Sequence, residues 1–537
     1  MHLSVRLIGL AGAALLCISG STIAQISILA LEGQVVPGVG TLNGFRAPVI
    51  NDDGDWVVIA DTSNPDIFED TLLLSNNGLE FQEGYVLAEP VGASIHSFLT
   101  ATLDNRDASA LRLQLYGISG TNDTGIFIGD KLVVQKGGVS FAPEFAPGSF
   151  WRTIQICQQN NSGQLVVGGH IDDLAVPGNS QTAFVRIDLD TNGEIISEEL
   201  LVRNGGVLPG QTLETQSIIT LSGSTAFNDG GQLMFAANLF GPLISDDVVY
   251  LDDQLLAQDG SPSPAAGRNW KTLTSANVAL NNCGDWLIGA DLDGDPASDS
   301  LLVKNGAKFV QKGDFLQAIA PYRLTSSMDI KPVYLGENGA VLWYGSWDAP
   351  SFMNEGLFLD NTLIVQKGVT QVGGATIIDL GGPYDFSLSP YGEWVIFEAL
   401  LNNGSKGVFA WGGGPWKGLG YGLAGTGGVT PCHTGRGDLT AGATVIHAFD
   451  NALPGSTAAL VFSLTELNAP FKGGRLIPFP DFLVLGLPTG ATGSLSLPSV
   501  FPPGIPAGLE IYTQFWIIDP AAPAGFSATN GLSGTTG

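Results

Sequence analysis

An acidic loop in the second half of the chain has residue types and spacing that suit metal binding. Asp291, Asp293, Asp295 and Asp299 occupy positions 1, 3, 5 and 9 of one short segment. Calcium is a hard cation that gathers about six to eight oxygen ligands, and alternate carboxylates of one tight turn can supply several of them. The spacing therefore predicts a calcium site. The alternative is a solvated acidic turn, which is common in a chain this rich in acidic residues.

A second acidic loop matches the EF-hand pattern D-x-[DN]-x-[DN]-G-x5-E, with Asp188, Asp190, Asn192 and Glu199 at the ligand positions. An EF-hand needs helices on both sides of the loop. Here the flanking sequences AFVRI and IISEELLV predict strands. Asp-Thr-Asn-Gly is also a good hairpin turn. The loop therefore has two interpretations, a calcium ligand set and the tip of an extended hairpin.

The sequence contains no recognisable catalytic signature. There is no GxSxG elbow, no HExxH pair, and no histidine spacing typical of a metal centre. Acidic residues are abundant, but the sequence does not show which of them face each other across a substrate. We therefore assign no catalytic residue and no organic cofactor, and we expect a non-enzymatic protein.

These loops belong to a repeat of about 55 residues. Its first element reads Asn-x-x-Gly-polar-apolar, as in NDDGDWVVIAD and NNCGDWLIGADL, and its steps are 53, 56, 68, 53, 55 and 53 residues. The seven anchor positions are Gly54, Asp107, Gly163, Gly231, Gly284, Gly339 and Gly392. Asn and Gly favour a tight turn, which we place between the first and second strands of each repeat. Trp56, Trp286 and Trp394 share one repeat position. We interpret them as core residues, with ligand stacking as the alternative.

A second element, a hairpin that ends in Gln-Lys-Gly or a variant, follows six of the anchors, as in GIFIGDKLVVQKG. The seventh hairpin lacks its closing strand. A segment with the matching ending, ISILALEG at residues 26–33, lies at the other end of the repeat region. Four short strands form a sheet too small to bury its own face, and radial stacking solves that problem. The repeats therefore predict an all-β fold, a seven-bladed β-propeller closed by the N-terminal strand. An open β-solenoid is the alternative.

The pattern resembles the β-propeller class, and more closely the uncharacterised propeller-like repeat proteins of the bacterial cell surface. The resemblance covers residues 26–411 and implies no activity. The Asp291 loop also resembles the calcium loops of integrin-type propellers. If the protein were a propeller enzyme, the turns at the channel mouth would supply the acids, and the candidates are Asp53, Asp104, Asp229 and Glu337.

The N-terminal segment 1–24 has the features of a signal peptide, with Arg6, an apolar stretch, and small residues before Gln25. A buried helix and a lipoprotein anchored at Cys17 are the alternatives. We expect no membrane-spanning segment in the mature chain, and an extracellular, periplasmic or cell-surface location. Only three cysteines lie beyond this segment, so we expect the core, and not a disulfide framework, to stabilise the chain.

Composition divides the chain further and limits its partners. Residues 25–411 form the expected propeller, the Gly-rich segment 412–428 a linker, and 429–537 a small C-terminal β-sandwich whose ending resembles modules on exported bacterial proteins. The formal net charge of −29 argues against nucleic acid, because phosphate binding needs Lys and Arg.

Two functions follow from these features. The first is a non-enzymatic binding or surface protein for an extracellular glycan or protein, supported by calcium. The second is a hydrolase or lyase that acts on extracellular polysaccharide.

Overall fold

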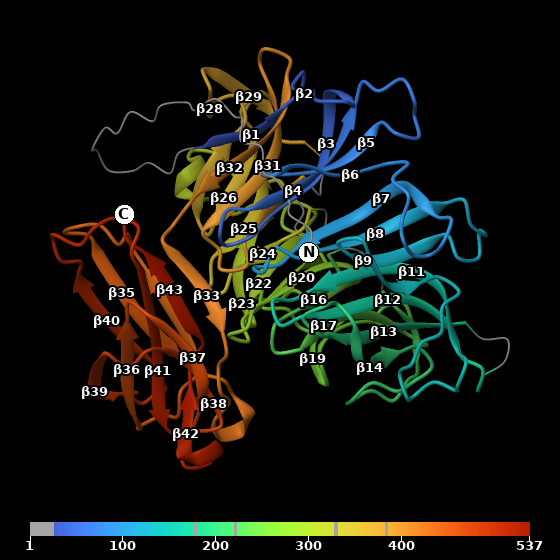
Figure 1. The fold of residues 1–537 in the computed structure, drawn as a ribbon. Coiled ribbons are helices and arrows are strands. Elements are labelled where there is room, and N and C mark those ends of the chain that lie inside the picture. Colours follow the sequence, from blue (N-terminus) through green and yellow to red (C-terminus); the bar gives the residue numbers. More distant parts are fainter. Residues whose placement is uncertain (1–25, 177–179, 220–222, 327–330, 382–384) are drawn as a thin grey trace, which may run out of the picture.

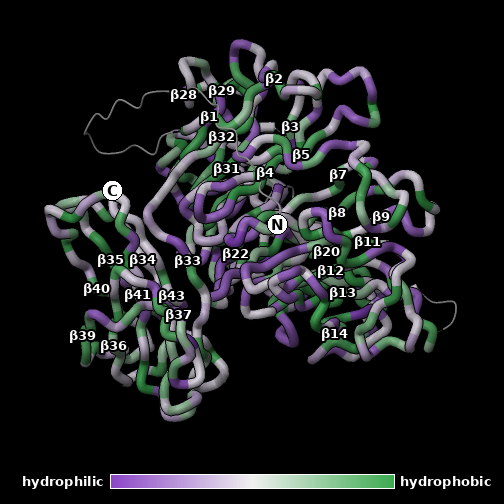
Figure 2. The backbone as a smooth tube through the Cα atoms, viewed as in Figure 1, coloured by the Kyte–Doolittle hydropathy of each residue, from purple (hydrophilic) through white to green (hydrophobic). Residues whose placement is uncertain are grey.

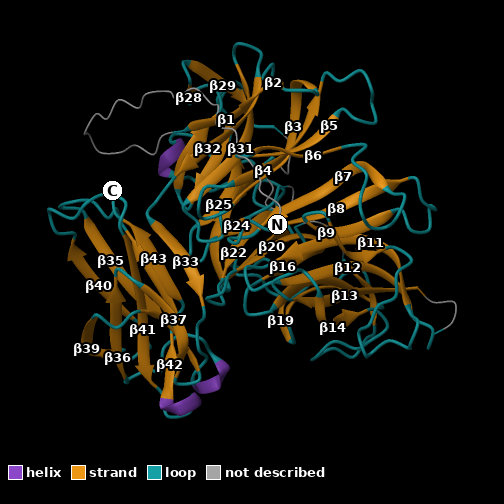
Figure 3. Cartoon of the chain, in the orientation of Figure 1, coloured by secondary structure: helices purple, strands orange, loops and turns teal. Residues whose placement is uncertain are grey.

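The computed structural model describes residues 26–176, 180–219, 223–326, 331–381 and 385–537. The expected signal peptide and Cys17 lie outside these residues. Figure 1 shows the sheets of residues 26–412 following one another around a common centre. Nearly all regular structure is β-strand (Figure 3). Among the described residues no helix is long and apolar enough to cross a bilayer.

The described strands of residues 26–412 form seven antiparallel sheets, most of them four-stranded. The first three contain β2 (Val35–Val36), β3 (Gly40–Ile50), β4 (Trp56–Thr62), β5 (Thr71–Ser75) and β6 (Gly78–Gln82); β7 (Ser94–Leu103), β8 (Ser109–Tyr116), β9 (Thr124–Ile128) and β10 (Lys131–Gln135); and β11 (Phe150–Gln159), β12 (Gln164–Asp172), β13 (Ser180–Leu189) and β14 (Ile195–Arg203).

The next three sheets contain β15 (Thr215–Ile218), β16 (Thr225–Phe227), β17 (Leu233–Leu239), β18 (Asp247–Leu251) and β19 (Gln254–Gln258); β20 (Trp270–Leu280), β21 (Trp286–Leu292), β22 (Ser300–Lys304) and β23 (Ala307–Gln311); and β24 (Tyr334–Leu335), β25 (Val341–Ser346), β26 (Glu355–Leu359) and β27 (Thr362–Gln366). A short 3-10 helix, η1 (Gln317–Ile319), precedes the last of these.

The seventh sheet joins the two ends of this region. It contains β28 (Gln371–Val372), β29 (Ala375–Asp379), β30 (Phe386–Leu388), β31 (Trp394–Leu401), β32 (Lys406–Gly412) and β1 (Ser27–Leu31). Strand β1 runs antiparallel to β32, with Ser27 opposite Ala410 and Leu31 opposite Gly407. The N-terminal strand therefore pairs with the last repeat, as the repeat pattern predicts.

Hydrophobic cores lie between neighbouring sheets. One core joins the fourth and fifth sheets through residues such as Met234 and Ile288. Another joins the seventh and first through Ile396 and Val58. In several sheets the strand after the turn is buried on both faces, as in β4, β17 and β21, which explains the near-continuous apolar sequence of these strands. Figure 2 shows hydrophobic stretches along strands of the repeat region. This all-β arrangement is consistent with a β-propeller.

The repeated tryptophans belong to these cores. Trp56 is buried in the core between the seventh and first sheets, and Trp394 packs against the same core. Trp286 packs against the core between the fourth and fifth sheets. Their interpretation as core residues is confirmed.

The C-terminal region contains three further sheets. A six-stranded sheet contains β33 (Trp416–Gly420), β43 (Gly531–Thr535), β41 (Glu510–Ile518), β36 (Thr457–Ser463), β39 (Phe482–Pro488) and β42 (Phe526–Ala528). The smaller sheets contain β34 (Cys432–Arg436), β35 (Thr444–Asp450) and β40 (Leu495–Val500), and β37 (Glu466–Phe471) with β38 (Gly474–Pro478). Two 3-10 helices, η2 (Thr426–Gly428) and η3 (Pro523–Gly525), lie in the connections.

Segment 412–428, expected as a linker, contains a strand. β33 pairs with β43, and Trp416 is buried. Its indole lies in one core with Tyr391 from the repeat region and Leu532 from the C-terminal region. Glycine content predicts flexibility, but this one large apolar side chain fixes the segment between the two parts of the chain.

Candidate functional site

The first turn of each repeat is organised by one side chain. The Oδ1 atom of Asn51 accepts hydrogen bonds from the backbone N–H groups of Asp53 and Asp55, at 3.0 and 2.9 Å. Asn160 and Asn281 bind their own turns in the same way. Gly54 has a φ of 80°, which only glycine adopts without strain. The Asn-x-x-Gly sequence is therefore a turn between first and second strands, as predicted.

The same asparagines connect neighbouring turns. Nδ2 of Asn160 donates to the carbonyl oxygen of Asn228 at 2.9 Å, and Nδ2 of Asn228 donates to that of Asn281 at 3.0 Å. Asn281 donates in turn to Gly336 at 3.1 Å. Asparagine suits this position because its side chain has both an acceptor for its own turn and a donor for the next one. Aspartate at position 104 can only accept, and it binds Arg106 as well as its own turn.

Replacing Asn281 by Asp tests this connection. Asn281→Asp keeps the oxygen that organises the turn but removes the donor to the carbonyl oxygen of Gly336, which then accepts only the backbone N–H of Gly339. It also places a carboxylate beside that buried oxygen, which repels it. We expect the free energy of unfolding to fall by about 1–3 kcal/mol, measured by chemical denaturation. Asn403→Asp is the matched control, because Asn403 is exposed and only accepts a bond within its own turn. Equal effects of the two substitutions would contradict the connecting role.

A second, closed set of hydrogen bonds includes the residue after the asparagine position in six turns and Tyr391, two residues after Ser389, in the seventh. We call this set the inner ring, and its members are Asp52, Asn105, Asn161, Asp229, Asn282, Glu337 and Tyr391. Most members donate their backbone N–H to the side-chain oxygen of the following member, at 2.6 to 3.0 Å. Glu337 instead donates its N–H to the carbonyl oxygen of Pro390, at 2.9 Å.

The inner ring closes between the last and first turns. The N–H of Tyr391 donates to Oδ1 of Asp52 at 2.6 Å, although 339 residues separate the two in the sequence. The side-chain amide of Asn105 also donates to the other Asp52 oxygen at 2.7 Å. The carboxylates of the ring therefore serve as acceptors that join one turn to the next.

The inner ring borders a polar cavity of about 300 Å³. The opposite wall comes from the C-terminal region and includes Tyr421, Thr430 and Asn530. None of the described residues that line the cavity is Lys or Arg. Burial raises the pKa of Asp52 to about 6, and burial together with the charge of Asp229 holds the pKa of Glu337 well above its ordinary value.

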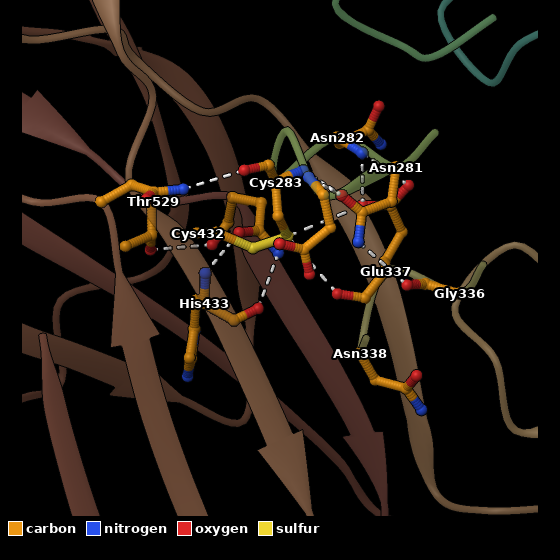
Figure 4. Close-up of a disulfide and its surroundings, with 12 residues drawn as sticks. Asn281, Asn282, Cys283, Gly336, Glu337, Asn338, Cys432, His433 and Thr529 are labelled. Carbon is orange, nitrogen blue, oxygen red and sulfur yellow. Dashed lines mark hydrogen bonds between the residues drawn. A yellow bond between two sulfur atoms is a disulfide. The ribbon is translucent and has the colours of Figure 1, made fainter. Parts of the chain in front are cut away.

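Several contacts hold the C-terminal region against these turns. A disulfide joins Cys283 to Cys432, while Cys157 is a buried free thiol. Figure 4 shows the disulfide beside Asn282 and Glu337 of the inner ring. Sequence reasoning did not pair these cysteines, because 149 residues separate them and they lie in different parts of the chain.

Polar contacts reinforce this interface on the first and seventh repeats. Lys417 forms an ion pair with Asp53, and the N–H of Trp416 donates to Glu393 at 2.9 Å. The Tyr391 hydroxyl donates to the carbonyl oxygen of Gly435 at 3.0 Å. The C-terminal region therefore covers the end of the repeat region at which the Asn-x-x-Gly turns converge.

The four acids proposed for an enzyme are not all at the cavity. Asp229 and Glu337 belong to the inner ring, whereas Asp53 binds Lys417 and Asp104 binds Arg106. Asp52 lines the cavity and was missed. Its position directly after the repeated asparagine, which Asp229 shares and which Glu337 shares in the copy with glycine in place of that asparagine, is the signal that could have found it.

The Asp291 loop distributes its carboxylates among different partners. Asp293 accepts the backbone N–H of Asn269 at 2.9 Å and lies 3.4 Å from Arg268. Asp299 forms an ion pair with Lys312 at 2.9 Å. Asp295 accepts the N–H of Ala297 within its own turn. Asp291 lies in β21.

The Asp188 loop is the tip of the β13–β14 hairpin. Asp190 accepts two backbone N–H groups of this turn, and Glu199 forms an ion pair with Arg186. Asp188 accepts the hydroxyl of Ser197 at 2.6 Å, and Asn192 lies in the turn. The hairpin interpretation is confirmed.

In the part of the chain that the structure describes, no three His, Cys, Asp or Glu side chains are grouped to hold a metal ion. Calcium binding at either loop stays a prediction, without a preformed ligand set.

Buried acids predict the pH dependence of stability. Burial raises the pKa of Asp52 to about 6 and those of Glu393 and Glu398 to about 7. A carboxyl with a raised pKa binds its proton more tightly in the folded state, so stability falls as the pH rises through the folded pKa. Burial lowers the pKa values of His433 and His447, so these two residues make the folded state less stable as the pH falls. Their effect begins only below about pH 6.5, where histidine in the unfolded chain becomes protonated.

We therefore expect the melting temperature to rise as the pH is lowered from 8 to about 6, measured by differential scanning calorimetry. Glu398→Gln removes one of the titrating groups and should flatten this rise. A melting temperature that falls over this interval would contradict the assignment.

The fold and the site define an all-β repeat protein whose C-terminal region is held over one end of the repeats. The chain belongs to a family of unknown function, DUF7453, whose profile matches residues 17–320. No curated protein sequence matches the chain.

Solved structures match the chain only distantly. A puromycin hydrolase is 11% identical with a TM-score of 0.34; the match covers 69% of this chain and spans about half, 51%, of the hydrolase. An α-L-arabinanase of Penicillium chrysogenum, complexed with arabinobiose, is 11% identical with a TM-score of 0.28, and the match covers 72% of this chain and 98% of that one. Matches at these TM-scores support no conclusion about activity.

Proposed function

We propose that this protein is an exported, non-enzymatic binding protein that presents one end of a seven-bladed β-propeller to an extracellular glycan. In this proposal the seven sheets are the blades, β1 closes the ring, and the C-terminal sheets form a β-sandwich. The disulfide supports export, because disulfides persist in oxidising compartments. A protein partner is the alternative occupant of the same end.

The observation that carries the proposal is the contrast between the two ends of the sheets. In an antiparallel meander, the turns between first and second strands lie at one end, which we call the anchor end. The loops between second and third strands, and those from sheet to sheet, lie at the other, which we call the open end. The C-terminal region covers the anchor end through Cys283, Glu393 and Tyr391. Binding is therefore assigned to the open end.

The open end also carries most of the exposed large apolar side chains of the repeat region. Members of this group come from four different sheets or the loops between them, and exposed large apolar side chains are typical of binding surfaces. The six most exposed are Ile67, Val86, Val91, Phe141, Leu243 and Ile244.

The test is retention of the mature protein on a panel of immobilised polysaccharides and cell-wall fractions, in calcium and again in EDTA. Retention in both conditions supports a glycan-binding protein that needs no calcium. Retention lost in EDTA supports calcium binding and makes Asp293→Asn/Asp295→Asn the next variant. No retention on any polysaccharide would contradict the glycan proposal and favour a protein partner.

The raised pKa values of Asp52 and Glu337 favour one alternative, a hydrolase or lyase that acts on polysaccharide at the anchor end. Against it, both side chains accept backbone hydrogen bonds from neighbouring turns, and the C-terminal region covers their cavity. The alternative predicts turnover of a polysaccharide in the same panel that Glu337→Gln abolishes. Absence of turnover would exclude it for the polysaccharides used.

A further inference from the structure

Three aromatic side chains lie together at the open end, where the first and second sheets meet. Phe68 lies in the loop between β4 and β5, His96 in β7, and Tyr116 at the end of β8. Their ring centroids are 6.0 Å apart for Phe68 and His96, 6.4 Å for Phe68 and Tyr116, and 6.2 Å for His96 and Tyr116. Phe68 is 55% exposed and Tyr116 66% exposed. These rings, which we call the aromatic trio, form a continuous surface that faces solvent.

The loop that carries Phe68 is fixed by its own side chains. Oδ1 of Asn64 accepts the N–H of Asp66 at 3.1 Å, and Oδ1 of Asp66 accepts the N–H of Phe68 at 3.0 Å. The side-chain amide of Asn64 donates to the carbonyl oxygen of Glu69 at 3.2 Å. Because the loop is ordered before a ligand arrives, little conformational entropy is lost when Phe68 makes a contact.

Two glycines bring the three segments into contact. A methyl group on Gly117 would lie 2.4 Å from the carbonyl oxygen of Gly92, so the end of β8 approaches the loop before β7 closely. A methyl group on Gly84 would lie 3.2 Å from the Glu69 side chain and 3.4 Å from the carbonyl oxygen of Phe68. The close packing of these backbone segments therefore positions the three rings of the trio beside one another.

The chemistry of this surface points to a neutral sugar. Aromatic faces attract the C–H groups of a pyranose ring, and they also stack on nucleic acid bases. The net charge of −29 disfavours the phosphate backbone of a nucleic acid. The exposed side chains of Asp66 and Glu69, in the same loop as Phe68, place acceptors for sugar hydroxyl groups beside the rings.

We propose that the aromatic trio is a stacking subsite for the pyranose rings of a neutral polysaccharide. This inference rests on the proposed function and names the site and the ligand class for it. Phe68 and Tyr116 supply the stacking faces, and the ring of His96 contacts both and extends the surface.

The test compares two double variants of the full mature chain. Phe68→Ala/Tyr116→Ala removes the stacking faces. Phe479→Ala/Phe482→Ala is the matched control, because both of its residues are exposed aromatics, at 46% and 55%, of the C-terminal region and lie outside the open end. The probes are insoluble cellulose and chitin, and soluble xylan and mixed-linkage β-glucan. Binding is measured by depletion for the insoluble probes and by calorimetry for the soluble ones, and melting temperatures check that each variant folds.

We expect the trio variant to bind at least one probe about tenfold more weakly than the wild type, and the control to stay within about twofold. Tyr116→Phe should bind like the wild type, because it keeps the ring. Equal binding by the trio variant and the wild type would overturn the proposed subsite but leave the proposed function intact. If both double variants bind the polysaccharide more weakly by the same factor, the subsite is overturned, and general adhesion through exposed apolar side chains explains the binding. A wild type that binds none of the four probes would overturn both the subsite and the glycan proposal.

Discussion

Ala30→Asp should lower the free energy of unfolding by at least about 3 kcal/mol, because it places an unpaired carboxylate in the core that closes the repeat region. Ala30 is buried at 3% exposure, in the core that also contains Ile396, Val408 and Ala410. Strand β1 is the edge strand of the seventh sheet, and its pairing with β32 joins the N-terminal strand to the last repeat. We expect a lower denaturant midpoint and faster proteolysis of residues 394–412.

The matched control for this prediction lies on the same strand. Ile28→Asp introduces the same charge at a side chain that is 43% exposed, so it should change the free energy of unfolding by less than about 1 kcal/mol. A large effect at both positions would indicate that charge on β1 is itself unfavourable. No effect at Ala30 would contradict closure by this strand.

Reduction of the Cys283–Cys432 disulfide should produce the second large effect. The bond closes a loop of 149 residues and links the inner ring to the C-terminal region. Disulfides of long loops restrict the unfolded chain and contribute about 2–5 kcal/mol. We expect reductant to lower the denaturant midpoint and to expose residues 420–432 to limited proteolysis, since fewer contacts then hold the C-terminal region to the repeats.

A variant without the bond separates this effect from other actions of the reductant. Cys283→Ala/Cys432→Ala should have the lower midpoint at the outset and should not respond further to reductant. The remaining contacts, the Lys417–Asp53 ion pair and the Tyr391–Gly435 hydrogen bond, should keep the C-terminal region docked under native conditions. An unchanged midpoint of the wild-type protein in reductant would contradict a stabilising role.

The inner ring gives buried carboxylates a structural role at the anchor end of this strongly acidic protein. Asp52, Asp229 and Glu337 each accept a backbone N–H group from the preceding turn of the ring, so each contributes to the connection between repeats. Burial raises the pKa values of Asp52 and Glu337, so both carboxyl groups bind a proton more tightly in the folded protein than in the unfolded chain. Keeping these buried carboxyl groups ionised therefore costs free energy. The pH dependence of the free energy of unfolding measures this cost for the ring and the buried acids near it.

Part of the candidate site could be predicted from local sequence. The Asn-x-x-Gly spacing identifies the turns correctly, because Asn51 and Gly54 satisfy hydrogen bonds and backbone angles within five residues. The hairpin at Asp190 follows from the same local chemistry. The calcium pattern at Asp291 is different, because a metal site depends on where Arg268 and Lys312 lie, and those residues come from elsewhere in the chain.

By itself, the sequence determined the all-β class, the repeat period and the positions of the turns, since these depend on side-chain type and spacing along one segment. It also identified the partner strand of residues 26–33, because the repeat pattern leaves the last hairpin without its closing strand. Only the tertiary structure decided which end of the repeats is covered, that Cys283 meets Cys432, that Trp416 turns a glycine-rich segment into a strand, and that Asp52 closes the inner ring with Tyr391. These features join residues far apart in the chain, and the contacts that create them are absent from any local pattern.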